Sequence, residues 1–358
     1  MEKNNYLYLR GAKHVIHTVF CVDDGGQKTY FDEQFKRPCA YSSGQQIKRS
    51  IIDLILERLN LEYPPVTFVK KVKTSEKGKK SIGEGNIIVT PEITSPSHLL
   101  GGFWKNHSTE EDDDILKRRA PLSIGAMSPL HPLLASVYKE DLVYNREQVP
   151  NTFVEFHDKD GGLMAEADVV TLLKELNSSA DKKKSQYVKG NKRTTGLFAF
   201  DIGIDLRALF TVHEDEIDKK TYEALLSTGW VPTKYHYGNG ITLPKKLREE
   251  YISVIADSIV DWRILTNQSR TFSPMETIAL SIGNNASMVR QSIRAELTGD
   301  WSNLSAIPVV EKNEEVEIFS SPSLSAHMFN KFDKEKSIEI AKQYIKDALL
   351  SFDYENQL

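Results

Sequence analysis

Apolar residues in this chain recur with two clear periods. Over residues 47–59 they return every three or four positions, which predicts an amphipathic helix that begins after Ser43. Over residues 196–206, Phe198 and Phe200 alternate with small or acidic residues, a period of two that is typical of a strand. The same patterns predict further strands at 6–22, 152–157 and 277–282, and further helices at 167–176, 217–226, 245–262 and 334–352.

The order of these elements predicts the fold class. Strands and helices are mixed without a regular β–α alternation, which favours an α+β domain with a mostly antiparallel sheet. No internal repeat is evident, and the length allows either one elaborated domain with insertions over residues 1–358 or two domains. Residues 66–150 show poor periodicity and frequent Pro, Gly and Ser, and we expect them to form a large insertion rather than a second core.

Composition narrows the class of protein. With 358 residues, 40% of them apolar, the chain can bury a sizeable core. Its formal net charge of −4 gives no sign of a nucleic-acid binder, but the charges are segregated along the sequence and local potential decides binding. Cys21 and Cys39 form no CxxC motif, and no apolar run is long enough for a membrane helix. We therefore expect a cytoplasmic protein without membrane contact.

The start of the first predicted helix carries the most informative polar pattern. Arg37 lies just before it, and Lys48 and Arg49 lie in its first turns. The N-terminus of a helix has unpaired N–H groups and the positive end of the helix dipole, and it binds phosphate readily. This segment therefore predicts a binding site for the phosphates of a nucleic-acid backbone. The alternative is an ordinary strand-to-helix turn, in which Ser42 or Ser43 caps the helix and the cations are solvated.

Two further polar segments carry clustered cations. Residues 182–193 contain six cations and no acid, and they have the character of a loop that could follow a phosphate backbone. Tyr187 within this run could stack on a base. Arg263 and Arg270 belong to another polar loop, in which Phe272 is expected to pack in the core. The alternative for the basic run is a solvated loop.

The sequence offers little for a catalytic reading, and it points to no cofactor. It contains no HExxH, no GxSxG and no Cys/His spacing that suits a metal. Asp23, Asp24 and Asp32 crowd one region and could bind a divalent ion, although Asp-Asp-Gly-Gly is more often turn chemistry. We therefore expect a protein that is not an enzyme.

Together, these segments resemble the backbone-subunit family of CRISPR Cascade-type effector complexes, within the RAMP superfamily. The resemblance covers roughly residues 6–285 and rests on four segments: the first strand with the motif at 37–49, the irregular basic insertion after the first helix, the strand at 196–206 behind a basic arm, and residues 271–282. It implies a modified RRM-like (ferredoxin-like) palm with finger-like residues 66–150 and a basic thumb-like arm at 177–196. Such subunits stack head to tail along a CRISPR RNA as scaffolds, while other subunits cleave the target.

The resemblance also implies roles for individual residues. Guide phosphates would be held by Arg37, Ser43, Gln45, Gln46, Lys48 and Arg49. The thumb-like arm would contribute Lys182, Lys183, Lys184, Lys189, Lys192 and Arg193, with secondary contacts from Arg263 and Arg270. The implied partners are crRNA, target DNA through the guide, other copies of the chain and other Cascade subunits. Base pairing with the guide, rather than the protein, would read sequence.

Three alternatives stay open at this point. Related RNA-targeting backbone subunits place a catalytic aspartate near the first strand, so Asp23, Asp24 or Asp32 could support metal-assisted RNA cleavage. A stand-alone RNA-processing enzyme of the superfamily is the second alternative, although no glycine-rich loop follows Gly299. The third is a protein-interaction module with incidental basic loops, which RNA co-purification would distinguish from the others.

Overall fold

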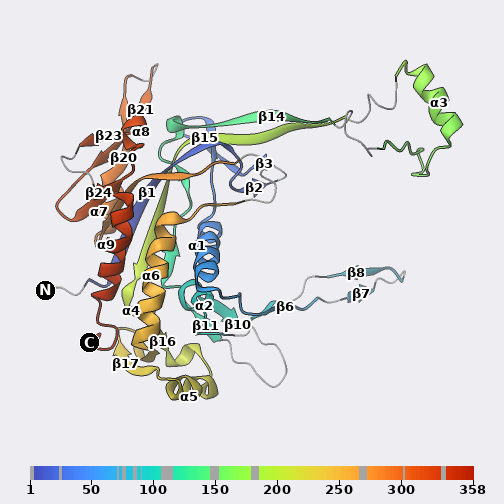
Figure 1. Ribbon diagram of the computed structural model, residues 1–358. Helices are drawn as coiled ribbons and strands as arrows, with labels where there is room; N and C mark the ends of the chain where they lie inside the picture. The colour runs from blue at the N-terminus through green and yellow to red at the C-terminus, as the bar shows by residue number, and fades with distance from the viewer. Residues whose placement is uncertain are drawn as a thin grey trace.

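A large central sheet with a layer of long helices over one face forms the body of the molecule (Figure 1). The computed structural model describes residues 4–23, 26–70, 72–74, 78–83, 87–89, 91–105, 116–145, 153–178, 185–265, 272–300, 303–331 and 336–358. Two hairpin arms project from the body toward the same side of the view (Figure 1). No helix among the described residues is long and apolar enough to cross a membrane.

The central sheet is built around β1, which pairs antiparallel with β15 on one side and with β19 on the other. Its strand order is β12-β15-β1-β19-β22-β24, and only the last pairing is parallel. Two more strands, β13 and β14, pair with the same edge of β15 as β12 does, but with residues nearer to the start of β15. The strands are β1 Tyr6–Thr18, β12 Leu122–Ile124, β13 Ser128–Pro129, β14 Ala135–Asn145, β15 Ser185–Asp205, β19 Glu276–Gly283, β22 Val316–Ser320 and β24 Lys336–Ser337. The predicted α+β class with a mostly antiparallel sheet is confirmed.

Three helices cover one face of this sheet and enclose the main core. They are α1 Gly44–Leu59, α6 Lys245–Asp261 and α9 Ile338–Leu350, and α6 lies between the other two (Figure 1). Ile47, Ile51 and Ile55 of α1 are fully buried in one core with Phe198 and Phe200 of β15. The apolar periods at 47–59 and 196–206 therefore predicted correctly which side chains of α1 and β15 face the core. The helices predicted at 167–176 and 217–226 are also present, as α3 Glu166–Glu175 and α5 Lys219–Ser227.

The opposite face of the sheet carries a smaller layer that the sequence patterns did not predict. A short helix, α7, and the sheet β20-β21-β23 pack there around a second core that contains Ala12, Val289 and Ile318. A third layer of small elements, including the sheet β16-β18-β17, closes the end of β1 and β15. These elements are α2 Pro96–Gly101, α4 Leu206–Leu209, α7 Ala286–Ser292, α8 Leu324–His327, β10 Phe103–Lys105, β11 Leu116–Arg118, β16 Thr211–His213, β17 Val231–Tyr235, β18 Gly238–Thr242, β20 Ile293–Thr298, β21 Ser305–Glu311, β23 Phe329–Lys331, and the 3-10 turns η1 Pro132–Leu134 and η3 Glu214–Glu216.

The longer arm is the hairpin of β14 with the outer half of β15, and α3 lies beyond its tip (Figure 1). A loop was expected across residues 182–193, and this expectation is wrong for 185–193, which are part of the 21-residue strand β15. The strand expected at 152–157 is also wrong, because of its described residues only His157 forms a bridge, an isolated one with Leu163. Residues 185–196 of β15 pair with β14, with one irregularity between Glu140 and Leu142, so backbone pairing rather than apolar alternation holds this part of the strand together.

The shorter arm lies within the predicted insertion at 66–150. It consists of two small ladders, β6 with β9 and β7 with β8 (Figure 1). Their bounds are β6 Val66–Phe68, β7 Val72–Thr74, β8 Lys80–Ile82 and β9 Ile87–Val89. The strands β12, β13 and β14 fall within the same predicted segment but pair in the central sheet. Leu122 of β12 and Met127 after it are buried in the main core. The proposed boundaries at 66–150 and 177–196 stay predictions.

Candidate nucleic-acid interface

The start of α1 is fixed by its own polar side chains. Ser43 is the N-cap, and its Oγ accepts a hydrogen bond from the backbone N–H of Gln46 at 3.3 Å. The Gln46 amide donates to the carbonyl of Phe20 at 2.9 Å and accepts from Ser42 Oγ at 3.2 Å. Both predicted phosphate ligands therefore have structural partners, which satisfy the helix start and tie it to the chain that follows β1.

One side of this helix start is covered by the β12–β13 connection. Ser42 and Met127 exchange two backbone hydrogen bonds, at 2.9 and 3.0 Å. A Cβ on Gly44 would lie 2.0 Å from the carbonyl oxygen of Ile124, so only glycine allows this approach. The helix start is thus sealed against the sheet on this side.

The cations near the helix start differ in how freely they can meet a phosphate. Burial lowers the pKa of the half-buried Lys48. Arg49 is exposed, and it bonds to Asp53 at 3.2 Å and lies 4.5 Å from the ring centre of Tyr63. Gln45 is exposed on the same first turn. Surface pairs of this kind are weak, so a phosphate can compete for Arg49.

Arg37 lies in a short hairpin that contacts the longer arm. The hairpin consists of β4 Thr29–Asp32 and β5 Arg37–Ala40, and β5 lies beside β14. Lys192 of β15 reaches across to β4, where its Nζ bonds to Thr29 Oγ1 at 3.2 Å. The structure therefore brings two basic segments, separated by about 150 positions in the sequence, to one region of the surface.

Arg193 has a different position from its neighbour Lys192. Only 1% of Arg193 is exposed, and its Nε donates to Glu140 Oε2 of β14 at 3.2 Å. A buried arginine with a carboxylate partner is a structural element of the hairpin base. Of the other cations predicted for the arm, Lys189 is described only as backbone within β15, and Lys182, Lys183 and Lys184 lie outside the described residues.

The third predicted segment is described only at its edges. Arg263 is exposed, and its guanidinium lies 6.0 Å from the ring centre of Phe272. Phe272 is 68% exposed, so the expectation that it packs in the core is wrong. Arg270 lies outside the described residues. The RNA-binding roles of all these residues stay predictions.

The aspartate region has turn chemistry where it is described. Asp32 Oδ1 accepts a hydrogen bond from the N–H of Phe35 at 2.8 Å and so closes the β4–β5 turn. Asp23 is exposed in the two-residue strand β2 Val22–Asp23, which pairs with β3 Gly26–Gln27, and Asp24 lies outside the described residues. Across the described part of the chain, no three His, Cys, Asp or Glu residues are grouped to hold a metal. Aspartate-dependent RNA cleavage stays a prediction.

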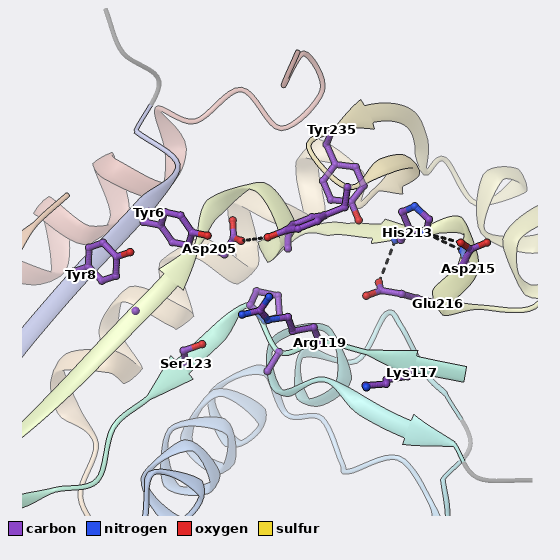
Figure 2. Close-up of a pocket in the computed structure, with 15 residues that line it drawn as sticks. Tyr6, Tyr8, Lys117, Arg119, Ser123, Asp205, His213, Asp215, Glu216 and Tyr235 are labelled. Atoms are coloured by element: carbon purple, nitrogen blue, oxygen red, sulfur yellow. Dashed lines mark hydrogen bonds and ion pairs between the residues drawn. The ribbon is translucent and has the colours of Figure 1, made fainter. Parts of the chain in front are cut away.

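A pocket that the sequence did not indicate lies where the ends of β1 and β15 meet the segment after β11 and the sheet β16-β18-β17 (Figure 2). Its volume is about 480 Å³, within the usual range for small-molecule sites. Its lining includes four tyrosines and two cations, which are Tyr6, Tyr8, Tyr235, Tyr237, Lys117 and Arg119. Because these residues come from separate segments, only the folded chain brings them together.

Comparison with known proteins gives a likeness of fold. No protein-family model and no curated protein sequence matches this chain. A solved chain described as "CRISPR RNA-guided surveillance complex, pre-nicking" is similar, with a TM-score of 0.51, 9% identity, and coverage of 96% of this chain and 100% of that chain. The fold is shared over nearly the full length. Another, described as "CRISPR RNA-guided surveillance complex", has a TM-score of 0.42 and 10% identity, and the match covers 96% of this chain and 99% of that one.

Proposed function

We propose that this chain is a non-catalytic, crRNA-binding backbone subunit of a CRISPR Cascade-type complex. It oligomerises along the guide RNA with other copies of itself, joins other Cascade subunits and supports pairing of the guide with target DNA. The observation that carries the proposal is the whole-length likeness to a chain of an RNA-guided surveillance complex, which covers 96% of this chain and 100% of the other. A likeness confined to one common module would carry far less weight.

The order of the main elements supports an RRM-like palm within this fold. The chain passes through β1, α1, β12, β15, α6 and β19, which is the β-α-β-β-α-β sequence of ferredoxin-like folds. In the sheet, β1 lies between β15 and β19, and β12 lies outside β15. Both helices pack on the same face, as that fold requires (Figure 1). The two arms are then insertions into the palm, which suits the finger and thumb roles.

A pair of lysines at the base of the longer arm supports contact with a phosphate backbone. Lys139 of β14 lies directly opposite Lys192 of β15 in the ladder. Like charges at facing positions of an antiparallel pair repel each other and destabilise the pairing. Neither lysine has an acidic partner among the described residues, and Lys139 is exposed. A phosphate that bridges the two ammonium groups would remove this repulsion.

The salt dependence of RNA binding tests this role. We would measure the affinity of the purified chain for a fluorescent crRNA by anisotropy over a series of salt concentrations. Each phosphate contact to single-stranded RNA contributes about 0.7 to the slope of log K against log salt. Lys139→Ala/Lys192→Ala removes the contact to the one phosphate that bridges both ammonium groups, so it should lower that slope by about 0.7. The matched control is Lys219→Ala/Lys220→Ala, which removes two exposed lysines from α5 and should leave the slope unchanged.

Assembly is tested by size-exclusion chromatography with absorbance at 260 and 280 nm. The wild-type chain should elute as a large, RNA-rich species, and Lys48→Ala/Arg49→Ala should shift it toward an RNA-free monomer. Asp23→Ala/Asp32→Ala should leave the state of labelled RNA in magnesium unchanged. A wild-type chain that binds no crRNA at low salt would refute the proposal, and RNA cleavage that these aspartates support would refute its non-catalytic part.

A further inference from the structure

Two of the four pocket tyrosines, Tyr6 and Tyr237, are held in place by polar bonds to Arg207 and Asp205. Arg207 bonds to Asp205 through Nε at 2.9 Å and lies over the rings of Tyr6 and Tyr237, 4.8 and 5.3 Å from their centres. The hydroxyl of Tyr237 donates to Asp205 Oδ2 at 3.1 Å. Tyr8 stacks on Tyr6 with 5.6 Å between ring centres and 15° between ring planes. Tyr6 and Tyr237 therefore have protein partners that orient their rings, and Tyr8 and Tyr235 pack against those two rings.

The hydroxyls of Tyr8, Tyr235 and Tyr237 stay protonated near neutral pH. Burial raises the pKa of Tyr8, Tyr235 and Tyr237, and nearby carboxylates add to the effect. Neutral phenols keep the electron-rich ring faces and the O–H donors that suit a flat, polar-edged ligand. The wall therefore favours an aromatic group that has hydrogen-bonding atoms at its edge.

The opposite wall supplies positive charge that the protein itself does not neutralise. Lys117 and Arg119 reach the pocket from β11 and the residues after it (Figure 2), and both are exposed. Neither has an ion pair within the part of the chain that the structure describes. By contrast, Glu216 is bonded to Arg118 at 2.6 Å, and Asp205 to Arg207. The third carboxylate of the lining, Asp215, lies 3.5 Å from the His213 ring and forms no ion pair with Lys117 or Arg119, so these two cations are available to an anion.

We infer that this pocket binds a nucleotide, with its base against the tyrosine rings and its phosphate at Lys117 and Arg119. The source is either a free nucleotide or an unpaired nucleotide of an RNA that the chain holds. Purine bases cover more ring surface than pyrimidines, so AMP and GMP bind more tightly than UMP. None of the residues predicted for guide phosphates lines the pocket, so it is a site separate from the proposed phosphate contacts.

Calorimetric titration of the RNA-free chain with AMP, adenosine and inorganic phosphate tests the site. AMP should bind saturably, and adenosine and phosphate at least about tenfold more weakly, because each lacks half of the recognised groups. Lys117→Ala/Arg119→Ala should weaken AMP about tenfold and leave adenosine unchanged. Tyr8→Ala should weaken AMP and adenosine alike, because it removes part of the stacking surface. The Lys219→Ala/Lys220→Ala variant, with the same loss of charge away from the pocket, should bind AMP as the wild type does.

Three outcomes would overturn the inference. They are the absence of saturable AMP binding, phosphate that binds as tightly as AMP, and pocket variants that bind AMP with wild-type affinity. A repeat of the titration with crRNA-loaded protein separates the two sources: displacement of AMP identifies a nucleotide of the RNA as the occupant, and unchanged binding identifies a free nucleotide. Because the first titration uses no RNA, its failure leaves the proposed crRNA binding untested and intact.

Discussion

Arg118→Met should destabilise the fold strongly, while Arg119→Met should not. Arg118 is 3% exposed, and its guanidinium forms hydrogen bonds to three backbone carbonyls and to the carboxylate of Glu216. These acceptors belong to Leu99 of α2, Ala208 of α4, and Thr211 of β16. One side chain therefore joins three small elements that have little secondary structure of their own to hold them together.

The expected loss in the free energy of unfolding depends on how Glu216 is left when methionine replaces Arg118. Removal of one partner of a buried ion pair costs about 3–5 kcal/mol, because the other charge stays buried without compensation. The Glu216 side chain is 17% exposed and also accepts from the N–H of His213 at 3.1 Å, so water can reach it and one bond survives. We therefore expect a loss near the lower end, about 3 kcal/mol, with methionine filling most of the arginine volume.

Urea denaturation followed by far-UV circular dichroism measures this loss. The midpoint should fall with an unchanged slope for Arg118→Met. Arg119 is exposed and makes no ion pair among the described residues, so Arg119→Met should stay within about 0.5 kcal/mol of the wild type. Equal losses for the two variants, or no loss for Arg118→Met, would refute the reasoning that this buried network holds the end of the sheet together.

Three further predictions test other parts of the fold. Burial lowers the pKa of Lys13 from 10.5 to about 7, so between pH 7 and 10.5 the unfolded chain binds one proton more than the folded chain. The free energy of unfolding measured in urea should therefore rise with pH above 7, by up to about 1.4 kcal/mol per pH unit, and Lys13→Met should remove that rise. Gly44→Ala should lower the free energy of unfolding by about 1–3 kcal/mol, because the added Cβ would overlap the Ile124 carbonyl oxygen. A variant more stable than the wild type would contradict this contact. Ser43→Ala should cost about 1 kcal/mol through loss of the N-cap, whereas Ser43→Asp should retain stability by the same assay.

The core helices and strands were predictable because burial leaves a period in the sequence. Ile47, Ile51 and Ile55 mark the inner face of α1, and Phe198 and Phe200 mark that of β15. The outer half of β15 leaves no such mark, since it projects from the body and its pairing with β14 is made by backbone groups. The layer of α7 and β20 was missed for another reason, because its elements are short and their apolar contacts lie mostly in other segments.

The candidate sites were harder to predict than the fold, because a polar residue does not reveal its partner in the sequence. Ser43 and Gln46 were expected to meet phosphate, and both make hydrogen bonds within the protein. The pocket had no local signal at all, since Tyr6, Arg119 and Tyr235 are far apart in the chain. Only the packing of the end of β1 against the small sheet places them around one cavity.

The buried arginines and the facing lysines Lys139 and Lys192 have different roles, and this difference sharpens the expected interface. Arg118, Arg193 and Arg207 are buried or nearly so and bond to carboxylates within the chain, which suits the planar, multiply donating guanidinium. Lys139 and Lys192 face each other without an acidic partner among the described residues, as strongly hydrated point charges that a phosphate can bridge. A count of basic residues in a run therefore overstates the charge that an RNA meets. Substitution of the lysines should change the salt dependence of RNA binding, and substitution of the buried arginines should change stability first.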